Sequence, residues 1–241
     1  MHNYGIDNFT KDGLVDDTLH TMALGIEADW NGTSMMRLLQ KNFSNSTRTT
    51  KHEKFEDGLA CFRTRLKTYY KNGHDANPDY KWSRIDRLTL KMLGKENNPT
   101  LKAKGGETND ITLFVLGNVR SCATLDPLLP HLVQAGQELQ NIKGILRQFK
   151  RKIPVPERHV LMTSCVRFLT FAKIGLMKLK PKAHRFMHMI RNIGKNGNPR
   201  TYGTWWDEHD NGIIAGQAKT VHARHFSEGI FLRILAKETL G

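Results

Sequence analysis

The 241-residue sequence has little cysteine and no long uncharged apolar run. Its three cysteines, Cys61, Cys122 and Cys165, lie far apart. Such a set provides neither a disulfide framework nor a CxxC metal knuckle, which favours a reducing compartment. The most apolar stretch, residues 160–179, is interrupted by charged residues such as Arg167 and Lys173, so we expect no membrane-spanning helix. The first residues, MHNYGIDNFTKDG, include neither an apolar nor an Arg-rich leader, and we expect no export or organelle signal there.

Acidic residues are scarce relative to basic ones. The chain contains 23 Asp and Glu against 37 Lys and Arg, giving a formal net charge of +14. An excess of this sign favours a polyanionic partner, most simply nucleic acid. Hydrophobic residues make up 39% of the chain. That share is sufficient for a buried core and argues against intrinsic disorder.

Strand-like alternation is nearly absent, and apolar residues recur at helical spacing instead. One example is the series Phe55, Leu59, Phe62 and Leu66 on one face of residues 53–70. The sequence predicts a mainly α fold with little or no sheet, in a single helical domain over residues 1–241. A subdivision into 1–106 and 107–241 stays open. Further helices are expected near residues 16–26, 79–93, 110–119, 128–149, 157–179, 184–193, 208–219 and 227–237, with one short strand at 200–206.

The segment DDTLHTMALG, residues 16–25, contains an acid and a histidine three positions apart. Asp17 and His20 would project from one face of the first turn of a helix. A carboxylate at that place is favoured by the helix dipole, so a simple helix cap is one interpretation of Asp17. A role in binding an ion or a phosphate is the other.

The segment GNPRTYGTWWDEHDNG, residues 197–212, combines acids with tryptophans. Asp207, Glu208 and Asp210 follow Trp205 and Trp206 directly, in the more basic half of the chain. Carboxylates clustered in this way can hold hard cations through their oxygens. The alternative is a solvated acidic helix start that follows a tryptophan-containing strand.

Taken together, these two segments resemble the catalytic core of cut-and-paste DNA transposases of the CACTA (En/Spm-like) group and its relatives. The second carboxylate of that family lies in a D-x-M-H segment that is followed by apolar residues and often by a glycine. Residues Asp17 to Gly25 match this pattern, with Leu19 in place of the usual Met. The last carboxylate of the family is a Glu after a Gly/Pro loop and aromatics, and Glu208 matches that order. Residues 180–188, KPKAHRFMH, are similar to a Lys-Pro-Lys-x-His and His element. Residues 101–107, LKAKGGE, are similar to a Lys-rich stretch before a Glu and a helix.

The resemblance implies a metal-dependent enzyme of the ribonuclease-H type, in which two Mg²⁺ ions assist DNA cleavage and strand transfer. Asp17 and Glu208 would be two of three metal-binding carboxylates, with Asp207 as a rival for the last position. His20 would orient Asp17 or a phosphate. The long helical block between the two carboxylates matches the α-helical insertion of this family.

One departure concerns the first carboxylate of the family, which lies on a strand well before the D-x-x-H segment. Asp7 is the only earlier acid outside the helix start, and its surroundings do not resemble a core strand. We therefore expect the carboxy-terminal portion of a transposase core, as a fragment or decayed copy that is inactive alone. A eukaryotic transposase would work in the nucleus, and another origin would still place the chain inside a cell.

Several basic and aromatic residues are candidates for contact with DNA. They are His20, Lys182, His184, Arg185, Arg191, Lys195, Arg200 and Trp205. A second candidate is a helical stripe of Lys143, Arg147, Lys150 and Arg151, for which a solvated face is an equal interpretation. Zinc binding by His184 and His188 is disfavoured because no third ligand of the right kind lies nearby.

Two other functions remain open. The first is a non-catalytic, basic, helical nucleic-acid-binding protein such as a viral nucleoprotein. The second is a helical protein-interaction module whose charge reflects only solubility. A homo-oligomer is compatible with all three interpretations. Closeness of Asp17 to Glu208 would favour the transposase, and steep salt dependence of binding would favour any protein that contacts phosphates.

Overall fold

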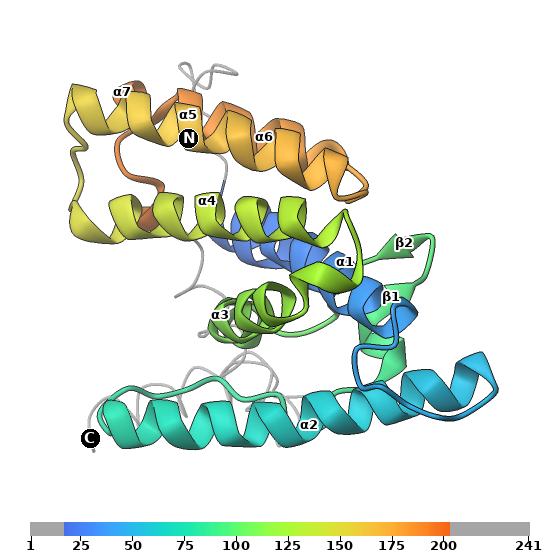
Figure 1. The fold of residues 1–241 in the computed structure, drawn as a ribbon. Helices are drawn as coiled ribbons and strands as arrows, with labels where there is room; N and C mark the ends of the chain where they lie inside the picture. Colours follow the sequence, from blue (N-terminus) through green and yellow to red (C-terminus); the bar gives the residue numbers. More distant parts are fainter. Residues whose placement is uncertain (1–16, 203–241) are drawn as a thin grey trace, which may run out of the picture. The chain divides into compact units, whose positions relative to one another are not determined.

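The computed structural model describes residues 17–202, which form a mainly helical fold (Figure 1). Strand is confined there to the two-residue pair β1 (Gly94–Lys95) and β2 (Asn98–Pro99), which is antiparallel. The α-helices of this range are α1 (Ala28–Gln40), α2 (Lys51–Ala76), α3 (Gly105–Ser121), α4 (Leu129–Gln148), α5 (Val155–Ile174), α6 (Pro181–Arg191) and α7 (Ile193–Asn196). A π-helix, Leu19–Glu27, leads directly into α1, and short 3-10 turns cover Leu90–Leu93, Ala123–Leu125 and Pro199–Thr201. The prediction of a mainly α fold is confirmed.

The helix α1 is buried on nearly every side. It packs against α2, α3 and α4 and against β2. The indole of Trp30 is fully buried, and its Nε1 donates to the backbone oxygen of Leu132 in α4 at 3.1 Å. Helices from before and after residue 106 therefore share one core in the described part of the chain.

The helices α4 and α5 form a hairpin, and they lie side by side in Figure 1. Their buried residues follow helical spacing, as Leu132, Leu139 and Leu146 do in α4. The next helix, α6, covers another side of α5, where the rings of Phe168 and Phe186 meet edge to face at 6.0 Å. This three-helix arrangement carries α6 towards the π-helix, which it also contacts.

A buried carboxylate ties the turn between α3 and α4 to α1. The side chain of Asp126 is fully buried and lies 2.6 Å from Arg37 Nη2 and 2.9 Å from Lys41 Nζ. Burial alone would raise the pKa of Asp126. The hydrogen bond from the Leu128 backbone N–H and the two cations outweigh burial and lower this pKa below its ordinary value.

One predicted helix is absent, and the predicted start of the next is wrong. Residues 79–93 do not form a helix, because only Leu90–Leu93 makes a helical turn, of the 3-10 type. The next helix begins at Gly105 rather than at Asn109 or Asp110, with the Lys104 N–H donating to Glu107 Oε2 at 2.8 Å. The Asp110 carboxylate instead accepts a hydrogen bond from the backbone N–H of Ser83 at 2.9 Å. The predicted strand over 200–206 is described only as far as residue 202, and residues 199–201 form a 3-10 turn.

Two of the three cysteines lie within helices, Cys61 in α2 and Cys165 in α5, whereas Cys122 directly follows α3. Cys165 is fully buried, and burial raises the pKa of its thiol to about 12, which makes it unreactive. Cys61 and Cys122 are half-buried against the core. Across residues 17–202, every helix is too short or too polar to cross a lipid bilayer.

Candidate functional site

Asp17 and His20 meet at the first turn of the π-helix. Asp17 Oδ2 accepts a hydrogen bond from the His20 backbone N–H at 2.8 Å and lies 2.6 Å from His20 Nδ1. The carboxylate therefore caps the helix and holds the imidazole, as the spacing predicted. Both side chains reach the surface, His20 with 51% and Asp17 with 19% of its area exposed.

The π-helix is closed on one side by α6. Helices with this wide turn are rare and usually short. Gly25 permits the close approach, because a Cβ there would lie 3.0 Å from Cδ of Lys182 and 2.9 Å from the backbone oxygen of His20. The ammonium of Lys182 donates to the backbone oxygen of Leu24 at 2.8 Å. Lys182 thus has a partner within the chain, and its contact with nucleic acid stays a prediction.

Lys180, which directly precedes α6, also joins this helix to the amino-terminal helices. Lys180 Nζ lies 2.5 Å from Asp29 Oδ1, and the Asp29 side chain is only 6% exposed. This ion pair joins residues 151 positions apart, and nothing in the local sequence predicts it. The Lys-Pro-Lys-x-His element, residues 180–184, therefore packs on the helix that begins at Asp17.

The Gly-Asn-Pro loop also reaches this helix. Gly197 has φ +84°, and a Cβ there would lie 2.8 Å from the backbone oxygen of Arg151, so both conformation and space favour glycine. The buried Asn198 amide donates to the backbone oxygens of Leu146 and Phe149 at the end of α4. The next residue, Pro199, accepts a hydrogen bond on its backbone oxygen from the Thr18 hydroxyl at 3.4 Å. The loop is thereby held between the end of α4 and the residue after Asp17.

The predicted DNA-contacting residues of α6 and the loop lie on the surface. His184, Arg185, Arg191, Lys195 and Arg200 are all exposed. The rings of His184 and His188 approach each other, with 2.9 Å between their Nε2 atoms. Arg185 and Lys195 have additional interactions, so their charges are not all available to a ligand.

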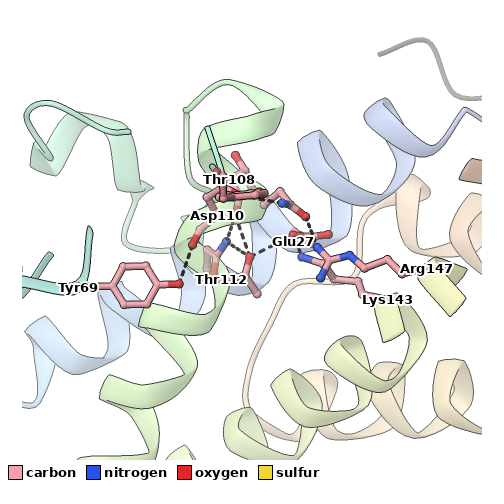
Figure 2. A network of polar contacts seen from close by, with 10 residues as sticks. Glu27, Tyr69, Thr108, Asp110, Thr112, Lys143 and Arg147 are labelled. Carbon is pink, nitrogen blue, oxygen red and sulfur yellow. Dashed lines mark hydrogen bonds and ion pairs between the residues drawn. The ribbon is translucent and has the colours of Figure 1, made fainter. Parts of the chain in front are cut away.

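The predicted basic stripe on α4 is wrong, because Lys143 points inward. Its ammonium is buried and lies 2.9 Å from Glu27 Oε2, as Figure 2 shows. Thr112 of α3 donates to the same carboxylate at 3.1 Å. The helix ends at Gln148, so Lys150 and Arg151 lie beyond it. Sequence reasoning missed this pair, although Lys143 lies four residues after Leu139 and three before Leu146, on the buried face of α4.

The other predicted metal ligands follow the loop at 197–201 in sequence. Asp207 and Glu208 lie outside the described residues, and so does Trp205. Within residues 17–202, no group of three or more His, Cys, Asp or Glu side chains is arranged to hold a metal ion. Asp17 is therefore the one predicted ligand whose surroundings are described, and Mg²⁺ binding stays a prediction.

Comparisons of the chain with protein-family models, with curated proteins and with solved structures give no match. An interpretation of function consequently depends on the residues and their contacts. The described contacts bring three segments together, namely residues 17–25, 180–184 and 197–201.

Proposed function

We propose that this chain carries the second and last metal-binding carboxylates, Asp17 and Glu208, of a metal-dependent DNA transposase. The described residues would then be the helical insertion and the carboxy-terminal portion of a ribonuclease-H-like core. DNA is the partner, and the nucleus is the compartment if the chain is eukaryotic.

The meeting of the motif segments on the helix that begins at Asp17 is the observation that carries the proposal. The family-like elements at 17–25 and 180–184 are about 160 positions apart, yet Lys182 binds the backbone of Leu24. The loop at 197–201, which leads in sequence to Glu208, touches Thr18 through Pro199. Parts of one catalytic centre must lie close together, and these contacts meet that requirement.

The chemistry suits the residue types. Hard oxygen ligands such as Asp17 and Glu208 are those that Mg²⁺ prefers. Bound ions would activate the attacking oxygen and stabilise the leaving oxygen of a phosphodiester. His20 would hold the Asp17 carboxylate in one orientation through the contact at Nδ1. Asp207 competes with Glu208 for the last position.

A second function, non-catalytic nucleic-acid binding, is favoured by charge. Residues 151–202, which include α5, α6 and α7, contain twelve Lys and Arg and a single acid, Glu157. Such a segment attracts phosphates without any metal. A helical nucleoprotein would need no more than this.

Terbium luminescence separates the two functions. Tb³⁺ binds oxygen ligands as other hard cations do and is excited through nearby tryptophan, and Trp205 and Trp206 immediately precede Asp207 and Glu208. We expect a luminescence signal that Mg²⁺ displaces and that is lost both in Asp17→Asn and in Glu208→Gln. Asparagine also caps helices well, so Asp17→Asn keeps the fold.

Asp79→Asn is the matched control, because Asp79 is exposed and lies outside the three segments. It should bind Tb³⁺ as the unaltered protein does, and Asp207→Asn shows which of the two neighbouring acids is the ligand. Retention of the full signal in Asp17→Asn would overturn the transposase proposal. Absence of any Tb³⁺ signal, together with DNA binding that weakens steeply with salt, would favour the nucleoprotein.

A further inference from the structure

A cleft of about 460 Å³ lies between the start of α5 and the end of α6, and none of residues 17–25 lines it. Its walls combine cationic and apolar side chains. Arg158, His159, His188 and Arg191 provide the polar lining, and Met162 and Met187 belong to the apolar lining. A volume of this size is typical of sites for small organic ligands.

The charged side chains that line the cleft are all basic. None of its lining side chains is acidic. The Nε atom of Arg158 is buried and has no hydrogen-bond partner within the described residues. A guanidinium that is not fully paired within the protein retains N–H donors for a ligand in the cleft.

The position of Arg158 is set by a close contact with the start of α7. A Cβ added at Gly194 would lie 2.3 Å from Arg158 Nη1, so the guanidinium occupies the space that the glycine leaves. Arg191, on the last turn of α6, is exposed beside it. Two guanidinium groups at one cleft form the arrangement that binds phosphate oxygens in pairs.

We propose that this cleft binds one nucleotide of a single DNA strand, with its phosphate on Arg158 and Arg191 and its base on the methionines. Thioether groups make favourable contacts with aromatic rings, which suits a base better than an acyl chain. The surrounding excess of basic residues would guide the flanking phosphates. The inference rests on the proposed function for the choice of DNA, and the cleft itself is described independently of Asp17.

The test measures the affinity of a labelled short oligothymidylate by fluorescence anisotropy. Loss of one charge-assisted hydrogen bond corresponds to a rise in Kd of roughly tenfold, which we expect for Arg191→Gln and for Arg158→Gln. The matched control is Arg167→Gln on α5, which removes the same charge from an exposed residue outside the cleft lining. It should change Kd by less than about twofold.

The base contact is tested with an abasic oligonucleotide of equal charge. Met187→Ala should weaken binding of the oligothymidylate and leave binding of the abasic strand unchanged, because only the base meets the thioether. Thermal melting of each variant controls for folding, and Arg191, being exposed, is the safer of the two arginines to alter.

Equal effects of Arg191→Gln and Arg167→Gln would overturn the inference, since charge alone would then explain binding. Cleft-dependent capture by phosphatidylserine vesicles, without binding to the oligonucleotide, would overturn it in favour of a membrane surface. The two proposals fail separately. Arg191→Gln should weaken strand binding and leave Tb³⁺ binding intact. If the cleft variants lose strand binding but the parent protein gives no Tb³⁺ signal, only the catalytic proposal fails.

Discussion

The buried ion pair between Glu27 and Lys143 gives a sharp test of how the Asp17 helix is held. Glu27 closes the π-helix that begins just after Asp17, and Lys143 extends from α4. Their side chains are 3% and 7% exposed, and 2.9 Å separates the two charged atoms. Lys143→Met removes the cation and leaves the Glu27 carboxylate with a hydrogen bond from the Thr112 hydroxyl, which Figure 2 also shows.

The expected cost is large because a buried charge loses its counter-ion. Breaking one member of a buried pair typically costs about 3–5 kcal/mol of unfolding free energy. For a domain of this size such a loss corresponds to a fall in melting temperature of roughly 10 °C. Replacing both partners, as Glu27→Met with Lys143→Met, removes the stranded charge and should return stability to within about 1 kcal/mol of the parent.

Urea unfolding followed by far-UV circular dichroism measures these differences. Lys173→Met is the control, because Lys173 is an exposed lysine on α5, and it should change stability by less than about 0.5 kcal/mol. A Lys143→Met variant as stable as this control would refute the burial argument. So would a double variant that is less stable than Lys143→Met, because the buried carboxylate would then not be the source of the cost.

Three further predictions concern the elements around the site. Asp126→Asn should destabilise the protein at pH 7, and the difference from the parent should shrink as pH falls below about 4, because a lowered carboxyl pKa gives stability that is present above the unfolded pKa and lost on protonation. Thermal melting across that pH range checks it, and a constant difference would contradict it. Gly197→Ala should cost about 1 kcal/mol or more of unfolding free energy, because of the positive φ and the short approach to the Arg151 oxygen; an unchanged urea midpoint would count against it. Thr50→Ala should cost about 1 kcal/mol, because the Thr50 hydroxyl accepts from the Glu53 N–H at 3.3 Å in the capping box of α2. Thr64→Ala on the exposed face of α2 should be nearly neutral by comparison.

Helices whose apolar residues face one neighbour could be predicted from the sequence. The series Phe55, Leu59, Phe62 and Leu66 is buried in α2 as its spacing indicated, and α4 extends over nearly the predicted range. In these helices the local pattern and the tertiary packing agree. The period of the apolar residues was therefore sufficient evidence.

The segment 79–89 could not be predicted, because its partners lie elsewhere in the chain. The backbone N–H of Ile85 donates to the Tyr70 hydroxyl, and the backbone oxygen of Leu88 accepts from Arg63. Trp82 packs edge to face against the ring of Tyr69. Side chains of α2 thus satisfy the backbone groups that a helix would have paired internally, and propensity was overridden by tertiary contacts.

In the candidate site, too, local contacts could be predicted from the sequence and long-range contacts could not. The contact between Asp17 and His20 is local, so a spacing of three residues was sufficient to predict it. The approach of Lys182 to the π-helix and of Pro199 to Thr18 depends on the whole helical arrangement. A sequence motif could name these segments, but it could not show that they meet.

A residue of a family-like motif can serve either the packing of the fold or the chemistry of the site, and the contacts distinguish these two roles. Gly25, Lys182 and Asn198 each have a packing role here, since they permit or make contacts between segments distant in sequence. Their replacement should therefore lower stability whether or not the protein handles DNA. Asp17 differs, because asparagine can keep its capping contact while removing its charge. Among the described motif residues, a loss of ion binding without a loss of stability is thus expected only at Asp17, and that separation would distinguish a catalytic carboxylate from a residue that merely belongs to the fold.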